Sequence, residues 1–122
     1  MKKKKYNVEL LAPAGSYEAL QAAIDNGADA VYFGVGHINM RSVAAANFDL
    51  DDLKKISKIC QKAKIKSYLT VNTVLYDSDL EMMKKIIKTA KENKVTAVIV
   101  SDMAAVQYAD SIDMPLHIST QL

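Results

Sequence analysis

The side chains that could do chemistry in this chain lie where a series of short apolar runs end. We predict that five of them line a substrate site: Arg41, Asn72, Asp102, His117 and Gln121. Arg41 is the only arginine among sixteen basic residues, and its planar guanidinium suits a carboxylate or a phosphate. We therefore expect Arg41 to bind an anionic group, while a salt bridge that braces its loop explains the residue equally well.

Two further positions, Gly15 and Ser16, are candidates for anion binding. They precede a predicted helix, where backbone amides can hold an anion, and a plain tight turn is the alternative. Asp102 also has a second interpretation, as the cap of the helix that follows it. A lone histidine in an apolar strand is more often structural. Alternation nevertheless places His117 and Gln121 on one strand face, which suits a barrel interior near its mouth.

The sequence contains no recognised catalytic constellation, so the catalytic residues stay unassigned. It has no nucleophile elbow, no phosphate-binding P-loop and no His-x-x-x-His pair. The one cysteine, Cys60, excludes an internal disulfide and leaves no cysteine cluster for a metal. Cys60 also falls on the apolar stripe of a predicted helix, a poor place for a nucleophile. We therefore predict neither a metal nor a cofactor within this chain.

Five short apolar segments are predicted to be strands, and four amphipathic segments between them are predicted to be helices. Ser16, Asp49 and Ser78 are the predicted N-caps of the first three helices. Because strands alternate with helices, we expect a parallel sheet with right-handed crossovers. The predicted strands are Val8–Ala12, Ala30–Val35, Ser67–Asn72, Ala97–Val100 and Leu116–Thr120, and the fourth helix is Ala104–Ile112.

Two α/β architectures accommodate this order: a complete doubly wound sheet, and the N-terminal half of a TIM-like (β/α)8 barrel. A doubly wound domain normally closes with a helix over its last strand, and only Gln121 and Leu122 follow the fifth strand here. We therefore predict the barrel half, with five parallel strands and four helices, and interpret the chain as a fragment truncated after strand five. Residues 1–6 are then expected to form a Lys-rich flexible tail, and residues 7–122 the partial barrel domain.

Charge and hydropathy narrow the class of partner only slightly. The formal net charge is +2, too small by itself to indicate nucleic acid or membrane. No apolar run approaches the roughly 20 residues of a membrane span, so we expect a cytoplasmic location and no membrane partner. Lys2–Lys5 fit a frayed, solubilising terminus, or else an arm that contacts RNA or phosphate. Four lysines are predicted to be the solvated face of a helix rather than a nucleic-acid patch: Lys54, Lys55, Lys58 and Lys62.

Six short motifs at the strand ends follow one another in a specific order. They are ELLAPAG (9–15), NGADAVYFG (26–34), Met40-Arg41 with Asn47-Phe48, TVNT (70–73), AVIVSD (97–102) and HISTQ (117–121). Together they resemble the N-terminal part of peptidase family U32, the collagenase-like proteases. The resemblance covers nearly the whole chain beyond the lysine tail.

The resemblance implies the N-terminal, barrel-like domain of a longer, cytoplasmic, bacterial protein, a hydrolase of the U32 peptidase type. Other family members resemble iron–sulfur proteins that support hydroxylation of tRNA, ribosomal RNA or a quinone precursor, with signature cysteines downstream. The alternative function is therefore such a hydroxylation, with the cluster ligands outside this chain. The substrate is accordingly peptide or RNA.

Two further expectations concern the chain by itself. The fragment alone is expected to be inactive and to self-associate as a half-barrel. It also departs from the family pattern at Gln61 and Lys64, where histidine and glycine are usual, and this difference is expected to affect only packing.

Overall fold

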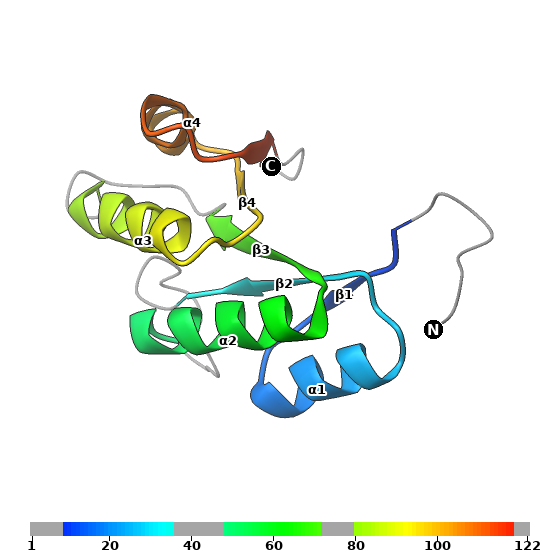
Figure 1. The fold of residues 1–122 in the computed structure, drawn as a ribbon. Coiled ribbons are helices and arrows are strands. Elements are labelled where there is room, and N and C mark those ends of the chain that lie inside the picture. The colour runs from blue at the N-terminus through cyan, green and yellow to red at the C-terminus, as the bar shows by residue number, and fades with distance from the viewer. Residues whose placement is uncertain (1–8, 36–47, 72–79, 119–122) are drawn as a thin grey trace.

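The computed structural model describes residues 9–35, 48–71 and 80–118. In these residues five strands alternate with four helices (Figure 1). The strands are β1 (Leu11–Pro13), β2 (Ala30–Gly34), β3 (Lys66–Val71), β4 (Ala97–Val100) and β5 (Leu116–Ile118). The helices are α1 (Tyr17–Asp25), α2 (Leu50–Ala63), α3 (Leu80–Glu92) and α4 (Met103–Ser111).

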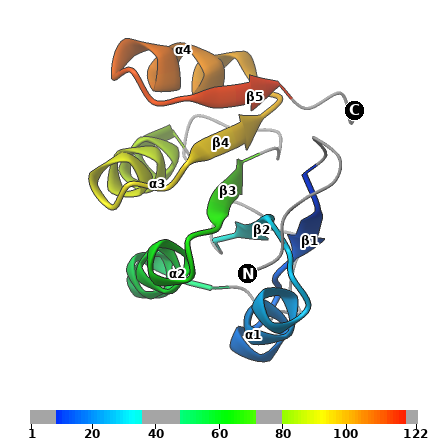
Figure 2. The same ribbon diagram turned by 45° about the vertical axis from the view of Figure 1, so that its right-hand side comes forward.

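All five strands belong to one parallel sheet, and their spatial order is their order in the chain. The four helices pack on one face, where the main core joins their apolar stripes to strand residues such as Val31 and Leu69. A small second cluster of Ala30, Tyr68 and Ala97 lies apart from that core and includes no helical residue. Figure 2 shows the sheet curving with the helices along its outer side. A doubly wound sheet reverses its strand order and is covered on both faces, so these residues form half of a (β/α)8 barrel.

Side-chain caps define where the helices begin. The hydroxyl of Ser16 accepts a hydrogen bond from the amide of Ala19 at 3.0 Å, at the start of α1. At the start of α2, Asp49 and Asp52 form a capping box, in which each carboxylate accepts from the other residue's amide. The predicted caps Ser16 and Asp49 are therefore confirmed, and Ser78 lies outside the described residues. None of the described helices is long and apolar enough to cross a membrane.

The strand boundaries differ from the prediction mainly at β1. The predicted strand ends before Pro13, whereas Pro13 is the last residue of β1 and pairs with Tyr32. Proline is tolerated there because β1 lies at the edge of the described sheet. The hydrogen bond at this end comes from Ala14, whose amide donates to the Tyr32 carbonyl at 2.9 Å. Val8 and Thr120, the predicted outer ends of the first and last strands, lie outside the described residues.

The two departures from the family pattern affect more than packing. The amide nitrogen of Gln61 donates to the Ser57 hydroxyl and to the Asn93 carbonyl, both at 2.9 Å, and so ties α2 to the end of α3. Lys64 closes α2 with a φ of 61°, in the left-handed region. Because glycine is the residue that this conformation favours, a lysine at position 64 changes the backbone energetics of the helix end.

Apolar side chains are exposed on both outer strands of the described sheet. Leu11 on β1 is 43% exposed and Ile118 on β5 is 61% exposed. On the strands between them, Val31, Leu69 and Val98 are fully buried. The two edges are therefore the places where the sheet presents apolar surface to a neighbour.

Candidate functional site

The carboxyl ends of the parallel strands lie at one edge of the sheet, where ligands bind in barrels of this kind. We call this edge the strand-end rim, and it comprises the described residues that close or follow the strands. Of the predicted site residues, the structure describes Gly15, Ser16, Asp102 and His117, whereas Arg41, Asn72 and Gln121 lie outside the described residues. The rim includes Ala14–Ser16, Gly34–Val35, Val71, Ser101–Asp102 and Ile118.

At the end of β1, the turn into α1 is explained by capping. Ser16 has an extended backbone and its hydroxyl accepts from the amide of Ala19. A Cβ atom placed on Gly15 would meet nothing within 4 Å, so no neighbouring group presses against this turn. The capping bond accounts for the serine without an anion, which favours the tight-turn interpretation of Gly15 and Ser16.

At the end of β4, Asp102 caps α4. Its Oδ1 atom accepts a hydrogen bond from the amide of Ala104 at 2.8 Å. The carboxylate is partly buried and lies at the rim, next to the strand end. The cap interpretation of Asp102 is therefore confirmed. A negative charge at the start of a helix is also favoured by the helix dipole, so the carboxylate is held ionised at the rim.

His117 lies on the face of the sheet opposite the helices, which we call the inner face. Its ring centroid is 5.2 Å from that of Tyr68, with an angle of 44° between the ring planes. Tyr68 is buried on the inner face, whereas His117 is exposed. His117 pairs with Ile99 on β4, three residues before Asp102, which corresponds to about 10 Å along a strand. The structure therefore places His117 and Asp102 on neighbouring strands but at different depths.

The inner face is closely packed where β2 and β3 reach the rim. The Thr70 hydroxyl donates to the Phe33 carbonyl at 3.2 Å. A Cβ atom at Gly34 would lie 3.2 Å from the same hydroxyl oxygen, tighter than most contacts of real Cβ atoms. Glycine is therefore required at position 34 by the close approach of Thr70, and this part of the rim has no room for a larger side chain.

A polar cluster that the sequence analysis did not predict lies at the opposite, amino-terminal end of the sheet. Lys66 Nζ lies 3.1 Å from Glu9 Oε2, and the Tyr68 hydroxyl donates to Glu9 Oε1 at 3.2 Å. Burial, followed by the negative charge of Glu9, raises the pKa of Tyr68, and the hydrogen bond to Glu9 raises the pKa of Lys66. The alternation of Lys66, Tyr68 and Thr70 along β3 is the signal that predicts these inward positions. Residues at this end of a barrel contribute mainly to stability.

The described residues were also tested as ligands for a metal or a cluster. In residues 9–35, 48–71 and 80–118, no group of three or more His, Cys, Asp and Glu side chains is arranged to hold a metal ion. The chain's single cysteine, Cys60, is 1% exposed, and burial raises the pKa of its thiol to about 11. An iron–sulfur cluster is held by several thiolates, so this protonated, buried thiol does not fit one, and Cys60 is a packing residue.

A one-sided sheet of sequential parallel strands, with candidate side chains at its carboxyl ends, defines the N-terminal half of a (β/α)8-barrel protein. Residues 15–122 match the family model for Peptidase family U32. The chain therefore belongs to peptidase family U32, as the strand-end motifs predict. The solved structure of the U32 peptidase Mk0906 shares the fold, with a TM-score of 0.68 at 11% identity. That alignment covers 97% of this chain and 50% of Mk0906.

Relatives with two kinds of name align with nearly all of the chain. It is 52% identical over 114 residues to a protein named Collagenase from Porphyromonas gingivalis, covering 93% of the chain and 28% of the relative. It is 35% identical over 116 residues to tRNA hydroxylation protein P from Helicobacter pylori, covering 93% and 28%. It is 34% identical over 119 residues to the 23S rRNA 5-hydroxycytidine C2501 synthase of Escherichia coli, covering 95% and 17%. The chain thus spans less than a third of each of these relatives.

Proposed function

We propose that this chain is the N-terminal half of the barrel of a U32-type peptidase in the collagenase-like group, and that its substrate is a polypeptide. The observation that carries the proposal is the 52% identity to the Porphyromonas gingivalis Collagenase over 93% of the chain. In this proposal the strand-end rim binds the substrate. The remaining barrel strands and the catalytic groups belong to the rest of a longer polypeptide.

The proposal assigns the predicted site residues to substrate binding. Arg41 binds an anionic group, which in a peptide is an acidic side chain or the terminal carboxylate. The other lining residues are Asn72, Asp102, His117 and Gln121. Asp102 is placed for this role by the cap that it provides to α4.

Peptide hydrolysis by the complete protein tests this proposal. We expect it to cleave gelatin and acidic collagen-derived peptides. Arg41→Ala should raise KM for acidic peptides by about tenfold, since a charge-assisted bidentate contact is lost. Lys62→Ala, an exposed helix position, is the matched single-charge control and should leave KM unchanged. Absence of turnover with and without a chelator would reject the peptidase proposal, and wild-type KM in Arg41→Ala would reject the role of the arginine.

A second candidate function is hydroxylation of RNA, supported by an iron–sulfur cluster whose ligands lie outside this chain. The observation that favours it is the naming of relatives for tRNA and ribosomal RNA hydroxylation. These relatives align with 93% and 95% of the chain, the same region that aligns with Collagenase. A cytoplasmic location suits both candidates.

Two measurements on the complete protein separate the candidates. The first is iron and acid-labile sulfide content after purification without oxygen, together with the visible absorption spectrum. The second is mass spectrometry of nucleosides from tRNA and ribosomal RNA of a deletion strain. A stoichiometric cluster and the loss of a hydroxylated nucleoside support the second candidate. An iron-free protein and an unchanged nucleoside profile return the weight to hydrolysis.

A further inference from the structure

The outer sides of α2 and α3 carry lysines at corresponding positions. The two helices have the same burial pattern over residues 51–60 and 81–90, so equivalent residues point in equivalent directions. Six exposed lysines, which we call the lysine face, occupy these positions: Lys54, Lys55 and Lys58 of α2, and Lys84, Lys85 and Lys88 of α3. Because α2 and α3 pack side by side, the face consists of two parallel rows of ammonium groups.

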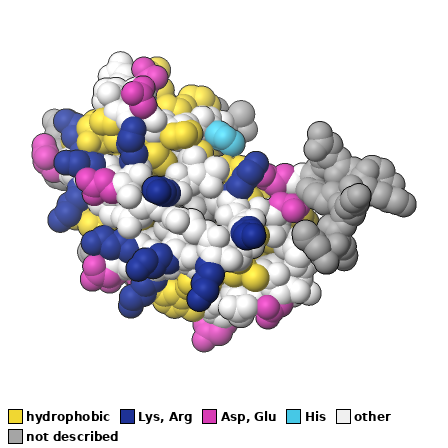
Figure 3. Space-filling view, viewed as in Figure 1, with side chains coloured by type: hydrophobic (Ala, Val, Ile, Leu, Met, Phe, Trp, Pro, Cys, Tyr) yellow, Lys and Arg dark blue, Asp and Glu magenta, His cyan; other side chains and the backbone are white. Residues whose placement is uncertain are grey.

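These rows are visible as a concentration of basic side chains on one side of the molecule. Figure 3 shows lysines gathered over the helical side, with fewer acidic side chains among them. Within the described residues, no carboxylate forms an ion pair with the lysine face, and the ion pair found there joins Lys66 to Glu9. Asp52, the acidic residue nearest to Lys55 in the chain, bonds to Tyr17 and to the amide of Asp49. The positive charge of the face is therefore not neutralised locally.

Two further lysines extend this arrangement at an energetic cost. Lys64 and Lys94 follow α2 and α3, are exposed, and both adopt the left-handed conformation, with φ of 61° and 62°. This conformation disfavours residues with a Cβ atom, and glycine is the usual choice. Two lysines at equivalent strained positions add charge to the same side of the barrel at the expense of backbone stability.

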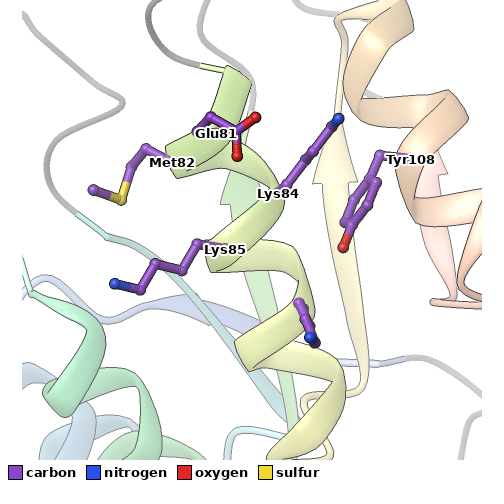
Figure 4. Close-up of a pocket in the computed structure, with 6 residues that line it drawn as sticks. Glu81, Met82, Lys84, Lys85 and Tyr108 are labelled. Atoms are coloured by element: carbon purple, nitrogen blue, oxygen red, sulfur yellow. The ribbon is translucent and has the colours of Figure 1, made fainter.

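A groove between α3 and α4 adds an aromatic ring to the lysine face. It has a volume of about 470 Å³ and is lined by Lys84, Lys85, Lys88 and Tyr108, among others. In Figure 4, Lys84 reaches from α3 toward the ring of Tyr108 on α4, and its Nζ lies 5.8 Å from the ring centroid. Lysines that can contact phosphates, beside a ring on which a base can stack, are the elements of single-stranded nucleic-acid binding.

The nature of the surface favours RNA over a lipid bilayer. Interfacial helices bury an apolar face in the membrane, whereas the exposed large apolar residues found in the described part of the chain, such as Met103 and Ile118, lie on other elements than α2 and α3. We propose that the lysine face and the adjoining Tyr108 groove form a docking surface for single-stranded or loop RNA. The choice of RNA as the polyanion rests on the second candidate function. The surface lies on the outside of the barrel, away from the strand-end rim, and positions RNA rather than reacting with it.

Fluorescence anisotropy with the complete protein tests the proposal. The probe is a labelled single-stranded RNA of about twenty nucleotides, a length that spans one or two binding sites. The variant Lys84→Ala/Lys85→Ala/Lys88→Ala should lower the affinity at low salt at least tenfold. It should also reduce the slope of log K against log salt by about 2, at roughly 0.7 per lost contact. Tyr108→Leu should weaken binding about fivefold or more without changing the slope, because stacking is not ionic.

A matched control separates a local surface from overall charge. Lys2→Ala/Lys3→Ala/Lys4→Ala removes the same charge from the tail, and it should leave the affinity within about threefold of wild type. Equal losses in the two triple variants, wild-type affinity in the α3 variant, or binding to phosphatidylserine vesicles in place of RNA would each overturn the proposal. All the lysines concerned are exposed, and thermal unfolding by circular dichroism confirms that each variant is folded.

The docking surface and the hydroxylation candidate can fail separately. If the α3 variant loses RNA binding while a deletion strain keeps every modified nucleoside, the surface is supported and hydroxylation is rejected. If the deletion removes a modified nucleoside, and the α3 variant restores it and binds RNA like wild type, hydroxylation stands and the surface is rejected.

Discussion

Tyr17 and Asp52 link the start of α1 to the start of α2 through a hydrogen bond of 2.5 Å. This bond is the main cause that lowers the pKa of Asp52, while burial is the main cause that raises the pKa of Tyr17 to about 12. The folded pKa of Asp52 thus lies below its unfolded value of about 3.9. The ionised carboxylate therefore stabilises the fold above that pH, and its contribution is lost as the pH falls through the folded pKa.

Replacing Tyr17 by phenylalanine should remove this contribution. We expect Tyr17→Phe to lower the free energy of unfolding by about 0.5–1 kcal/mol at pH 7, since the contact is partly exposed. The difference from wild type should narrow below about pH 4, where Asp52 is protonated in the unfolded state. Urea unfolding at pH 7 and at low pH measures both values. Tyr32→Phe, whose hydroxyl bonds to none of the described residues, is the control. A pH-independent difference would contradict the assignment.

Cys60 makes a second residue-scale prediction. Burial raises its folded pKa to about 11, above an unfolded value of about 8.5. The protonated thiol therefore stabilises the fold fully below about pH 8.5, and this contribution is lost as the pH rises toward the folded pKa. Cys60→Ala should cost about 1–2 kcal/mol at pH 7.5 through the lost core volume. The difference from wild type should shrink between about pH 8.5 and 10.5. In the native protein, the thiol should react with a disulfide reagent only after denaturant is added, and rapid native reaction would contradict its burial.

Single residues also show where sequence reasoning reaches its limit. Ser16 and Asp102 could be assigned to helix starts from their types and positions, and both are N-caps. The same positions are those where a barrel binds ligands, so the sequence by itself does not separate a cap from a site residue. The inward cluster around Glu9 was missed because its contacts join strands distant in the chain, and a carboxylate in an apolar run carries no sign of its partners.

Helix periodicity was the strongest signal at the scale of the elements. The predicted apolar stripe of α3 includes Met83, Ile86 and Ile87, which are all buried. Cys60 was likewise predicted to lie on the buried stripe of α2. Backbone conformation at the helix ends was harder to predict, since a lysine such as Lys64 gives no warning of a positive φ.

Replacement of the two left-handed lysines by glycine should stabilise the helix ends. A residue with a Cβ atom costs about 1–2 kcal/mol in this conformation relative to its preferred one. Because glycine also has more freedom in the unfolded chain, we expect Lys64→Gly and Lys94→Gly each to raise the free energy of unfolding by about 0.5–1 kcal/mol. Lys62→Gly, inside α2, is the control and should lower it by about 1 kcal/mol. Denaturant unfolding measures all three, and destabilisation by Lys64→Gly would show that the lysine side chain offsets the strain.

For the whole molecule, the sequence left two architectures open, and two properties of the structure decided between them. Strand order is a matter of long-range pairing, such as that of Ala30 with Lys66, and of Leu11 with Ala30, which no local pattern encodes. The packing of all four helices on one face is equally non-local. The motifs favoured the barrel half because they resemble a family, whereas periodicity alone fits either arrangement.

The half-barrel arrangement also predicts how the 122-residue chain behaves when it is produced alone. The two edge strands expose apolar side chains, with Leu11 43% and Ile118 61% exposed, and each edge offers unpaired backbone groups to another strand. We expect the isolated chain to self-associate in sedimentation experiments. Leu11→Lys and Ile118→Lys should each shift it toward monomer, because a charged edge disfavours pairing. Met103→Lys is the matched control, since Met103 is 66% exposed but lies on α4. A monomeric chain that unfolds cooperatively, or an equal effect of Met103→Lys, would show that association does not occur through the strand edges.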